Sequence, residues 1–306
     1  MRVGIAGAGA VGCHYGSLLQ QAGHALAYLA RGEHLSALQR DGLLHVSNGQ
    51  ETRLAVRAGG DAALLADCDA ILLTGKMTDF PTLLAGIGPH IRQDALLLTL
   101  QNGVAAPELA SSAFPGNAVA AGTAFIGARI ERPGVIVHSA AGGIRMGHWQ
   151  AGPGGRHFQP LLEALSEAGV AVREEPDPRL MLWRKLLWNV GFNPITAITR
   201  RFARDMAADA GTLKLVRAAM AEAVSVAQAA GVALDDDDVA KHVQVTLRMG
   251  PVKTSMWQDI ERGRPTEIDF LNGIVVQKGH EFGVPAPVNE MLCTLIHAIE
   301  DGARAA

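Results

Sequence analysis

Cysteines are few in this sequence, and long apolar runs are absent from it. The three cysteines among 306 residues, Cys13, Cys68 and Cys293, are odd in number and far apart. Such usage excludes a dense disulfide framework and favours reduced thiols in the cytoplasm. No apolar run approaches the roughly 18 residues that a membrane-spanning helix needs. We therefore expect a soluble, cytoplasmic, globular protein without a membrane partner.

An excess of positive charge is also missing. There are 27 lysines and arginines against 30 acidic residues, which gives a formal net charge of -3. This balance provides no basic field for a nucleic-acid backbone. The 11 histidines show no ligand spacing such as H-E-x-x-H. The DDDD run at 235–238 is typical of a solvated first turn of a helix, where acidic residues are favoured. We expect neither a bound metal nor a nucleic-acid partner.

The glycine-rich start of the chain, MRVGIAGAGAVGCHYGSLLQQAGH, carries the first functional signal. A β-prone run precedes the motif Gly7-Ala8-Gly9-Ala10-Val11-Gly12, apolar residues then recur at helical spacing, and the run HALAYLA follows. In this strand–turn–helix–strand setting, G-x-G-x-x-G is typical of a dinucleotide-binding site. The glycines allow a tight turn, close approach to a pyrophosphate and close packing of the helix. A signal peptide and a purely structural glycine turn are the alternatives.

The end of the second expected strand indicates which dinucleotide is bound. Arg31 lies there in YLARGEH, and a guanidinium pairs well with the 2′-phosphate of NADP. Glu33, two residues later, is an acid of the kind that holds the ribose of NAD. An ordinary exposed loop arginine is the alternative. Arg31 therefore predicts NADPH as the cofactor.

Two further apolar runs, CDAILLTGK and DALLLTLQNG, end in Lys76 and Asn102. Ligands of open parallel sheets bind at the carboxyl ends of the strands, so both residues are candidates for the cofactor site. A surface lysine and an ordinary Asn-Gly turn explain them equally well. The stretches at 118–146 predict extra strands that complete the sheet at its far edge.

Strand signals almost vanish after about residue 175, and helical patterns then dominate. We expect an α/β fold in which a Rossmann-type doubly wound sheet at 1–175 binds the dinucleotide. An all-helical substrate and catalytic domain is expected at 176–306. The second half is rich in Ala, Leu and Val, so a homodimer remains open.

The stretch LWRKLLWNVGFNPITAITR brings polar residues into an apolar helix. Lys185 and Asn189 are four residues apart and hence on one face. Asn193 either extends this stripe or caps a new helix that has Pro194 at its first position. A partly buried Lys185 has a lowered pKa and can act as a general acid. Alternatively, its amine reaches out to water from an amphipathic helix.

The stretch KTSMWQDIERGRPTEIDFLNG contains two further candidates. Thr266, with Asp269 three residues later, predicts the cap of a helix and puts Glu267 in its first turn. A glutamate at that place is routine, and Ser255 is equally consistent with an ordinary helix serine. Neither residue indicates function alone.

Four motifs occur together in the order GxGxxG, QNG, WRKLLWNVGFNP and TEIDFLNG. In this set the chain resembles the ketopantoate reductase (2-dehydropantoate 2-reductase) family over nearly its full length. The resemblance implies a Rossmann domain followed by a helical domain, with the active site between them. The implied cofactor-binding residues are Gly7, Gly9, Ala10, Val11, Gly12, Arg31, Lys76 and Asn102. The implied catalytic pair is Lys185 and Glu267, and the implied substrate-binding residues are Asn102, Lys185, Asn189, Asn193, Ser255 and Glu267.

The activity that this resemblance implies is NADPH-dependent reduction of ketopantoate to pantoate in pantothenate and coenzyme A biosynthesis, with Lys185 as general acid. Gln101 stands where some family members have histidine, and bulky Trp188 beside Asn189 leaves the substrate open. The rivals are a reductase of another branched 2-oxo acid and an NADP-binding regulator without turnover. A 3-hydroxyacid or sugar-acid dehydrogenase is a further rival, which the QNG and TEIDFLNG motifs disfavour.

Overall fold

The computed structural model describes the backbone of residues 1–305 and the side chains of residues 1–302. It divides into two compact units. Unit 1 comprises Met1–Gln101 and Ala106–Pro178, and unit 2 comprises Asn102–Ala105 and Arg179–Ala306. The segment that contains the QNG asparagine is thus part of the second unit.

A ten-stranded mixed sheet forms the centre of unit 1, in the order β4-β3-β9-β8-β7-β6-β1-β2-β5, with β10 paired to β9. Its strands are β1 (Arg2–Ala6), β2 (Ala25–Leu29), β3 (Leu43–Ser47), β4 (Gln50–Leu54), β5 (Ala58–Gly59), β6 (Ala70–Leu73), β7 (Leu96–Thr99), β8 (Ala118–Arg132), β9 (Val135–Gln150) and β10 (Val172–Glu174). The expected α/β class, a Rossmann-type sheet followed by a helical part, is confirmed.

The parallel half of the sheet positions the predicted cofactor residues. β1 pairs in parallel with β2 on one side and with β6 on the other. Residues in β6 and β7 are all buried, as continuous apolar runs covered on both faces should be. The carboxyl ends of β1, β2 and β6 therefore lie at one edge of the sheet, where they are followed by Gly7, Arg31 and Lys76.

The strands at 118–146 continue the sheet beyond β7, but the expectation that they form its far edge is wrong. β8 and β9 make a long antiparallel ribbon with several register shifts. The first residues of β9, 135–138, pair in parallel with β3, which in turn pairs with β4. The polar sequence of β4, in which no residue is buried, has little of the apolar alternation by which a strand is recognised.

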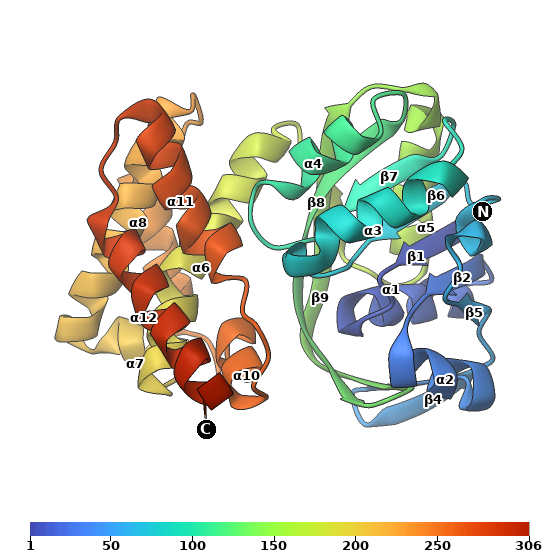
Figure 1. Ribbon diagram of the computed structural model, residues 1–306, viewed down its shortest axis with the longest axis horizontal. Helices are drawn as coiled ribbons and strands as arrows, with labels where there is room; N and C mark the ends of the chain where they lie inside the picture. Colours follow the sequence, from blue (N-terminus) through green and yellow to red (C-terminus); the bar gives the residue numbers. More distant parts are fainter. Residues whose placement is uncertain (306) are drawn as a thin grey trace. The chain divides into compact units, whose positions relative to one another are not determined.

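Helices cover both faces of the sheet in unit 1. They are α1 (Ala10–Gln21), α2 (Gly32–Asp41), α3 (Phe80–Ile87), α4 (Ala106–Ala113) and α5 (Phe158–Glu167), with the 3₁₀ turns η1 (Ala62–Leu65), η2 (Met77–Asp79), η3 (Gly88–His90) and η4 (Pro153–His157). Figure 1 shows α3 and α4 in front of the sheet and α1 and α5 behind it, in agreement with the contacts within each pair. Tyr15 and Leu19 of α1 join Phe158 and Leu161 of α5 in the buried core.

Unit 2 is all-helical, as expected. Its helices are α6 (Pro178–Thr199), α7 (Ala203–Ala208), α8 (Ala210–Ala229), α9 (Asp236–Leu247), α10 (Ser255–Glu261), α11 (Ile268–Phe282) and α12 (Pro287–Ala305). Every residue at 189–197 of α6 is buried, so this helix runs through the core of the unit. Within residues 1–305, no helix combines the length and the apolar character that crossing a membrane requires.

The acidic run at 235–238 begins α9, as expected, but it is not wholly solvated. Asp235 caps the helix by accepting a hydrogen bond from the backbone N–H of Asp238 at 3.0 Å. Asp238 itself is buried and pairs with Arg184 of α6 at 3.0 Å. Its charge therefore links α9 to α6, a long-range role that a local pattern of acids does not reveal.

Candidate active site

The glycine-rich turn of unit 1 requires glycine for two different steric reasons. Gly7 has φ +92°, and an added Cβ would lie 2.5 Å from the backbone nitrogen of Gly75 in the loop after β6. At Gly12 an added Cβ would lie 2.6 Å from Ile5 and would also clash with Thr74. The Thr74 hydroxyl donates to the carbonyl oxygen of Gly7 at 2.8 Å. These two glycines thus let β1, α1 and the β6 loop pack closely.

At Gly9, by contrast, an added Cβ would clash with nothing. The nearest atom to an added Cβ would be the carbonyl oxygen of Gly7, 3.9 Å away. Gly9 is the N-cap of α1 and has no side chain with which to cap this helix end. The N–H groups of Ala10, Val11 and Gly12 lie in the first turn, where a helix supplies no acceptor of its own. An uncrowded turn before free N–H groups fits the pyrophosphate of a dinucleotide.

Arg31 and Lys76 follow the strands on either side of this turn. Arg31 immediately precedes α2, and its side chain is 83% exposed. Its guanidinium forms an ion pair with Asp79, at the end of η2. Lys76 is exposed and precedes η2. The strand ends therefore bring together two cations and one carboxylate beside the glycine turn.

In unit 2, Asn102 and Glu267 lie together although 165 positions separate them in sequence. The amide Nδ2 of Asn102 donates to Oε2 of Glu267 at 3.1 Å. Gly103, with φ +89°, approaches α11 so closely that an added Cβ would lie 2.5 Å from the carbonyl oxygen of Phe270. The QNG segment therefore packs on the start of α11, which explains its place in unit 2.

The expected cap of α11 is wrong by one residue. Glu267, not Thr266, is the N-cap, and its side chain makes no capping hydrogen bond. Thr266 does accept from the backbone N–H of Ile268 at 3.3 Å. The Glu267 carboxylate is consequently available to contacts other than its own helix, such as the one with Asn102.

The polar stripe of α6 extends over Lys185, Asn189 and Asn193. The helix continues through Pro194, so Asn193 extends the stripe and does not cap a new helix. Asn189 and Asn193 are buried and contact each other at 3.5 Å. Among the described residues, Nδ2 of Asn189 and Oδ1 of Asn193 have no hydrogen-bond partner. Buried polar groups are rarely left unpaired, so this pair suits a polar ligand.

Lys185 is half-buried on the same helix. Burial lowers the pKa of its ammonium group to about 8, and the nearby charge of Glu267 opposes this shift. Desolvation disfavours the charged amine, whereas an opposite charge favours it. The lysine therefore remains mostly protonated at neutral pH but loses its proton more readily than an exposed lysine does.

A proline-dependent contact joins α6 to α11. Pro194 has no N–H, so the carbonyl oxygen of Val190, four residues earlier, lacks its helical donor. The side-chain amide of Asn272 in α11 donates to this oxygen at 3.0 Å. The helix that begins after Glu267 is thereby held against the helix that carries Lys185.

Two further residues singled out from the sequence, Ser255 and Trp188, are not part of the polar stripe of α6. Ser255 is exposed and begins α10, whose N-cap Thr254 contacts Thr196 of α6 at 2.7 Å between the hydroxyl oxygens. Trp188 donates from Nε1 to Thr246 of α9 at 2.9 Å. This bond orients its indole toward α9.

Sequence reasoning missed Thr74, Asp79 and Asn272. The sequence signal for Thr74 and Asp79 was their position in the loop after a buried strand, where ligand residues of parallel sheets gather. Thr74 directly follows β6, and Asp79 ends the 3₁₀ turn in the same loop. For Asn272 the signal was an asparagine in an apolar helix combined with a proline inside another helix. Its partner is a backbone atom of a distant segment, which no local pattern identifies.

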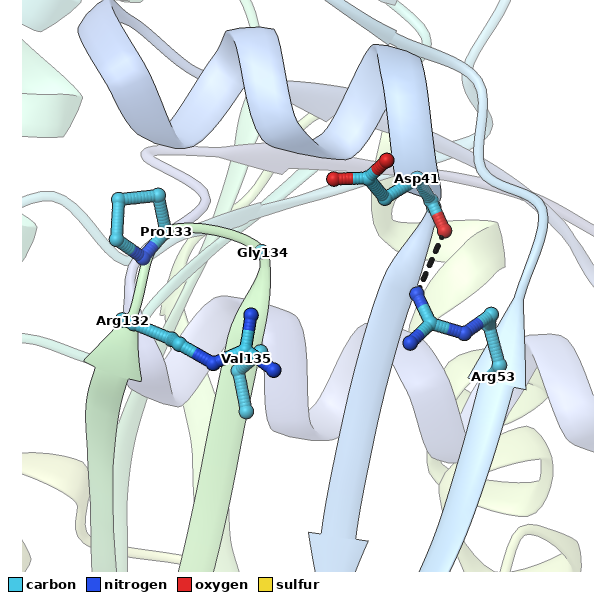
Figure 2. Close-up of a pocket in the computed structure, with 7 residues that line it drawn as sticks. Asp41, Arg53, Arg132, Pro133, Gly134 and Val135 are labelled. Atoms are coloured by element: carbon cyan, nitrogen blue, oxygen red, sulfur yellow. Dashed lines mark hydrogen bonds between the residues drawn. The ribbon is translucent and has the colours of Figure 1, made fainter.

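A separate pocket of unit 1 contains none of the predicted site residues. Figure 2 shows it at the end of α2, where Nη1 of Arg53 donates to the carbonyl oxygen of Asp41 at 2.8 Å. The rest of its lining comes from Gly42 and from residues 132–135 at the turn between β8 and β9. Since α2 begins next to Arg31 and ends at Asp41, this pocket lies at the opposite end of the helix from the predicted cofactor site.

A sheet whose parallel half ends at a glycine-rich turn, and a helical unit that carries the half-buried Lys185 with the charge of Glu267 nearby, define the class of two-unit dinucleotide-dependent oxidoreductases. The family models identify it further. Residues 3–151 match "Ketopantoate reductase PanE/ApbA", and residues 177–300 match "Ketopantoate reductase PanE/ApbA C terminal". The chain belongs to this family of oxidoreductases, so the resemblance noted in the sequence is confirmed.

Relatives of known name cover the whole chain. The 2-dehydropantoate 2-reductase of Mesorhizobium japonicum is 31% identical, with 99% of each chain covered, and that of Archaeoglobus fulgidus is 31% identical, with 98% covered. The crystal structure of a PanE/ApbA family ketopantoate reductase from Ralstonia eutropha has a TM-score of 0.92 at 32% identity, covering 99% of this chain and 100% of that one. D-Mandelate dehydrogenase with NADH and anilino(oxo)acetate has a TM-score of 0.91 at 27% identity, with the same coverage.

Proposed function

We propose that this protein reduces 2-dehydropantoate (ketopantoate) to pantoate with NADPH as the hydride source. Relatives about 31% identical over nearly the whole chain are named 2-dehydropantoate 2-reductases. The three described cysteines are free, which suits a reducing cytoplasm and a role in pantothenate biosynthesis there.

The observation that carries this proposal is the state of Lys185 in unit 2. Its pKa is lowered to about 8 by burial, while Glu267 favours the charged form. Glu267 also accepts a hydrogen bond from Asn102 of the QNG segment. The same carboxylate therefore acts on the charge of Lys185 and binds Asn102. A general acid is most effective when its pKa lies near the working pH, and Lys185 meets this condition.

The proposed chemistry divides the work between the dinucleotide and the protein. When bound, the nicotinamide ring supplies a hydride to the ketone carbon. The Lys185 ammonium stabilises the negative charge that develops on the carbonyl oxygen and donates the proton that makes it a hydroxyl group. The neutral amine then regains a proton from water.

The neighbouring polar groups place the substrate. The amide atoms of Asn189 and Asn193 that have no partner among the described residues suit the carboxylate and the hydroxyl group of ketopantoate. Ser255 is assigned to the carboxylate as well. Glu267 keeps Lys185 charged until the proton is transferred and orients Asn102. Such fixation keeps the reacting atoms in a productive pose.

The preference for NADPH rests on Arg31. The open turn at Gly9 suits the pyrophosphate, and the exposed guanidinium of Arg31 follows the strand next to β1. A planar guanidinium with paired donors recognises a phosphate better than a ribose hydroxyl. Lys76, in the loop after β6, adds a positive charge that attracts the pyrophosphate of either dinucleotide.

Another 2-oxo acid is the second candidate substrate. D-Mandelate dehydrogenase, whose structure contains an aryl-bearing oxo acid, has nearly the same fold at 27% identity. The bulky Trp188 neighbours Asn189 in the sequence of α6. Both observations favour a test of aromatic as well as branched 2-oxo acids.

The test is a set of initial-rate measurements with ketopantoate, 2-oxo-2-phenylacetate and a series of branched 2-oxo acids. Each substrate is run with NADPH and with NADH, and the loss of nicotinamide absorbance is followed. We expect the highest kcat/KM with ketopantoate and NADPH. A higher kcat/KM with the aryl acid would identify a different reductase. Tight NADPH binding without turnover of any acid would indicate a regulator.

A further inference from the structure

We propose that Asp79 sets the cofactor selectivity by competing with the 2′-phosphate of NADPH for the guanidinium of Arg31. The inference rests on the proposed assignment of Arg31 to that phosphate. Asp79 opposes the effect of Arg31. It makes the protein less selective for NADPH over NADH than Arg31 alone would make it.

The topology of unit 1 brings the two residues together. Arg31 follows β2, and Asp79 ends the 3₁₀ turn after β6. Both strands flank β1, whose carboxyl end is followed by the glycine turn. Residues 48 positions apart therefore meet at one edge of the sheet, where they form an ion pair.

The Asp79 carboxylate is directed to Arg31 rather than to its own helix. Asp79 occupies the N-cap position of α3, where an aspartate usually accepts a hydrogen bond from a backbone N–H of the first turn. Its side chain makes no such capping bond. The charge of Asp79 therefore acts on Arg31 and not on the helix end.

Charge and hydrogen bonding then predict the direction of the effect. Asp79 occupies Nη2 of Arg31, one of the guanidinium donors that a bidentate contact with a 2′-phosphate would use. The negative charge of the phosphate is also repelled by the neighbouring carboxylate. NADH carries a hydroxyl at this place, which can donate to a carboxylate. Asp79 therefore weakens NADPH binding and leaves NADH binding unchanged or slightly favoured.

The other charged side chains of this edge do not cancel the effect. Lys76 is exposed at the start of the same loop and attracts both dinucleotides through their pyrophosphate. Glu33 is exposed in the first turn of α2 and adds to the negative charge near Arg31. Asp79 is distinguished from Glu33 by its ion pair with the arginine.

The experiment compares Asp79→Asn with the wild type by calorimetric titration of NADPH and NADH, without substrate. We expect NADPH to bind about 2- to 5-fold more tightly to the variant, because exposed charge pairs have effects of this order. NADH binding should stay within about twofold or weaken. In 1 M salt the gain for NADPH should shrink, since the charges are then screened.

Asp41→Asn is the matched control. Asp41 is a similarly exposed carboxylate (47%, against 50% for Asp79) that pairs with an arginine, Arg40, at the far end of α2. The Asp41→Asn substitution removes the same charge from unit 1 and should change the affinity for neither NADPH nor NADH. An equal gain in this variant would overturn the proposal, because the effect would then be one of net charge.

Two further outcomes overturn the proposal. One is unchanged or weaker NADPH binding in Asp79→Asn. The other is an equal gain from Asp79→Asn when Arg31 is already replaced by Ala, since competition requires the guanidinium. Failure of the proposed reaction is distinguishable from failure of this inference. A protein that shows these shifts in dinucleotide affinity but does not reduce ketopantoate would support the role of Asp79 and contradict only the proposed substrate.

Discussion

The side-chain amide of Asn272 donates a 3.0 Å hydrogen bond to the carbonyl oxygen of Val190, four residues before Pro194. Because proline offers no N–H, this buried oxygen depends on a donor from outside its helix. The same amide also donates to Oδ1 of Asn289 in α12 at 2.9 Å. One side chain thus joins three helices of unit 2.

Asn272→Ala should therefore destabilise the protein by about 1–3 kcal/mol, because a buried carbonyl is left unpaired. The measurement is urea unfolding. In a Pro194→Ala background, where residue 194 regains an N–H for the Val190 oxygen, the loss should be smaller. Equal losses in both backgrounds would show that the Asn272–Val190 bond is not the cause.

Alanine substitutions at two glycines of the turn should have different effects: one on the stability of the protein, the other on cofactor binding. Gly12→Ala should cost about 1–3 kcal/mol of unfolding free energy, because its Cβ would meet Ile5 at 2.6 Å. Gly9→Ala should change stability by about 1 kcal/mol or less, since its Cβ would clash with nothing. Its NADPH affinity should nevertheless fall at least about tenfold, because the pyrophosphate must approach this backbone closely.

The measurements are urea unfolding and calorimetric NADPH titration on both variants. Gly23→Ala provides a further comparison, because an added Cβ meets nothing within 4 Å there and only the positive φ of +89° is strained. It should lower stability without affecting NADPH affinity in the folded protein. A Gly9→Ala variant with unchanged NADPH affinity would contradict the cofactor site.

The parallel strands and the stripe of α6 were predictable because their signals are local. The buried run at 70–73 is recognisable from the residues of one strand, and the four-residue spacing of Lys185 and Asn189 is recognisable from one helix. The pairing of β3 with β9, the burial of Asp238 and the Asn272–Val190 bond depend on contacts between distant segments. For Asn193, the helix continued through Pro194 because Asn272 supplies the missing donor.

The pH dependence of the reduction should report the ionisation of Lys185. Only the ammonium form donates a proton, so kcat/KM should fall as the pH rises through about 8, the value to which burial lowers the pKa. The measurement is kcat/KM for ketopantoate between pH 6 and 10. A profile that is flat over this range would contradict the role of Lys185.

Glu267→Gln should move this fall in kcat/KM to lower pH. The Glu267 charge raises the pKa of Lys185 against the opposing effect of burial. Its removal leaves desolvation unopposed, so the pKa drops below about 8 and the protonated fraction at neutral pH decreases. Glu281→Gln, which removes an exposed carboxylate of α11, should retain the wild-type profile. A shift to higher pH in Glu267→Gln would contradict the assigned electrostatics.

The most direct test of the account is the turnover of ketopantoate by folded Lys185→Ala at saturating NADPH. Loss of the general acid should lower kcat about 10²–10⁴-fold, while the NADPH affinity measured by titration stays unchanged. Lys214→Ala, which removes an exposed lysine of α8, should retain the wild-type kcat. A folded Lys185→Ala variant with a kcat close to that of the wild type would contradict the central claim that this amine donates the proton.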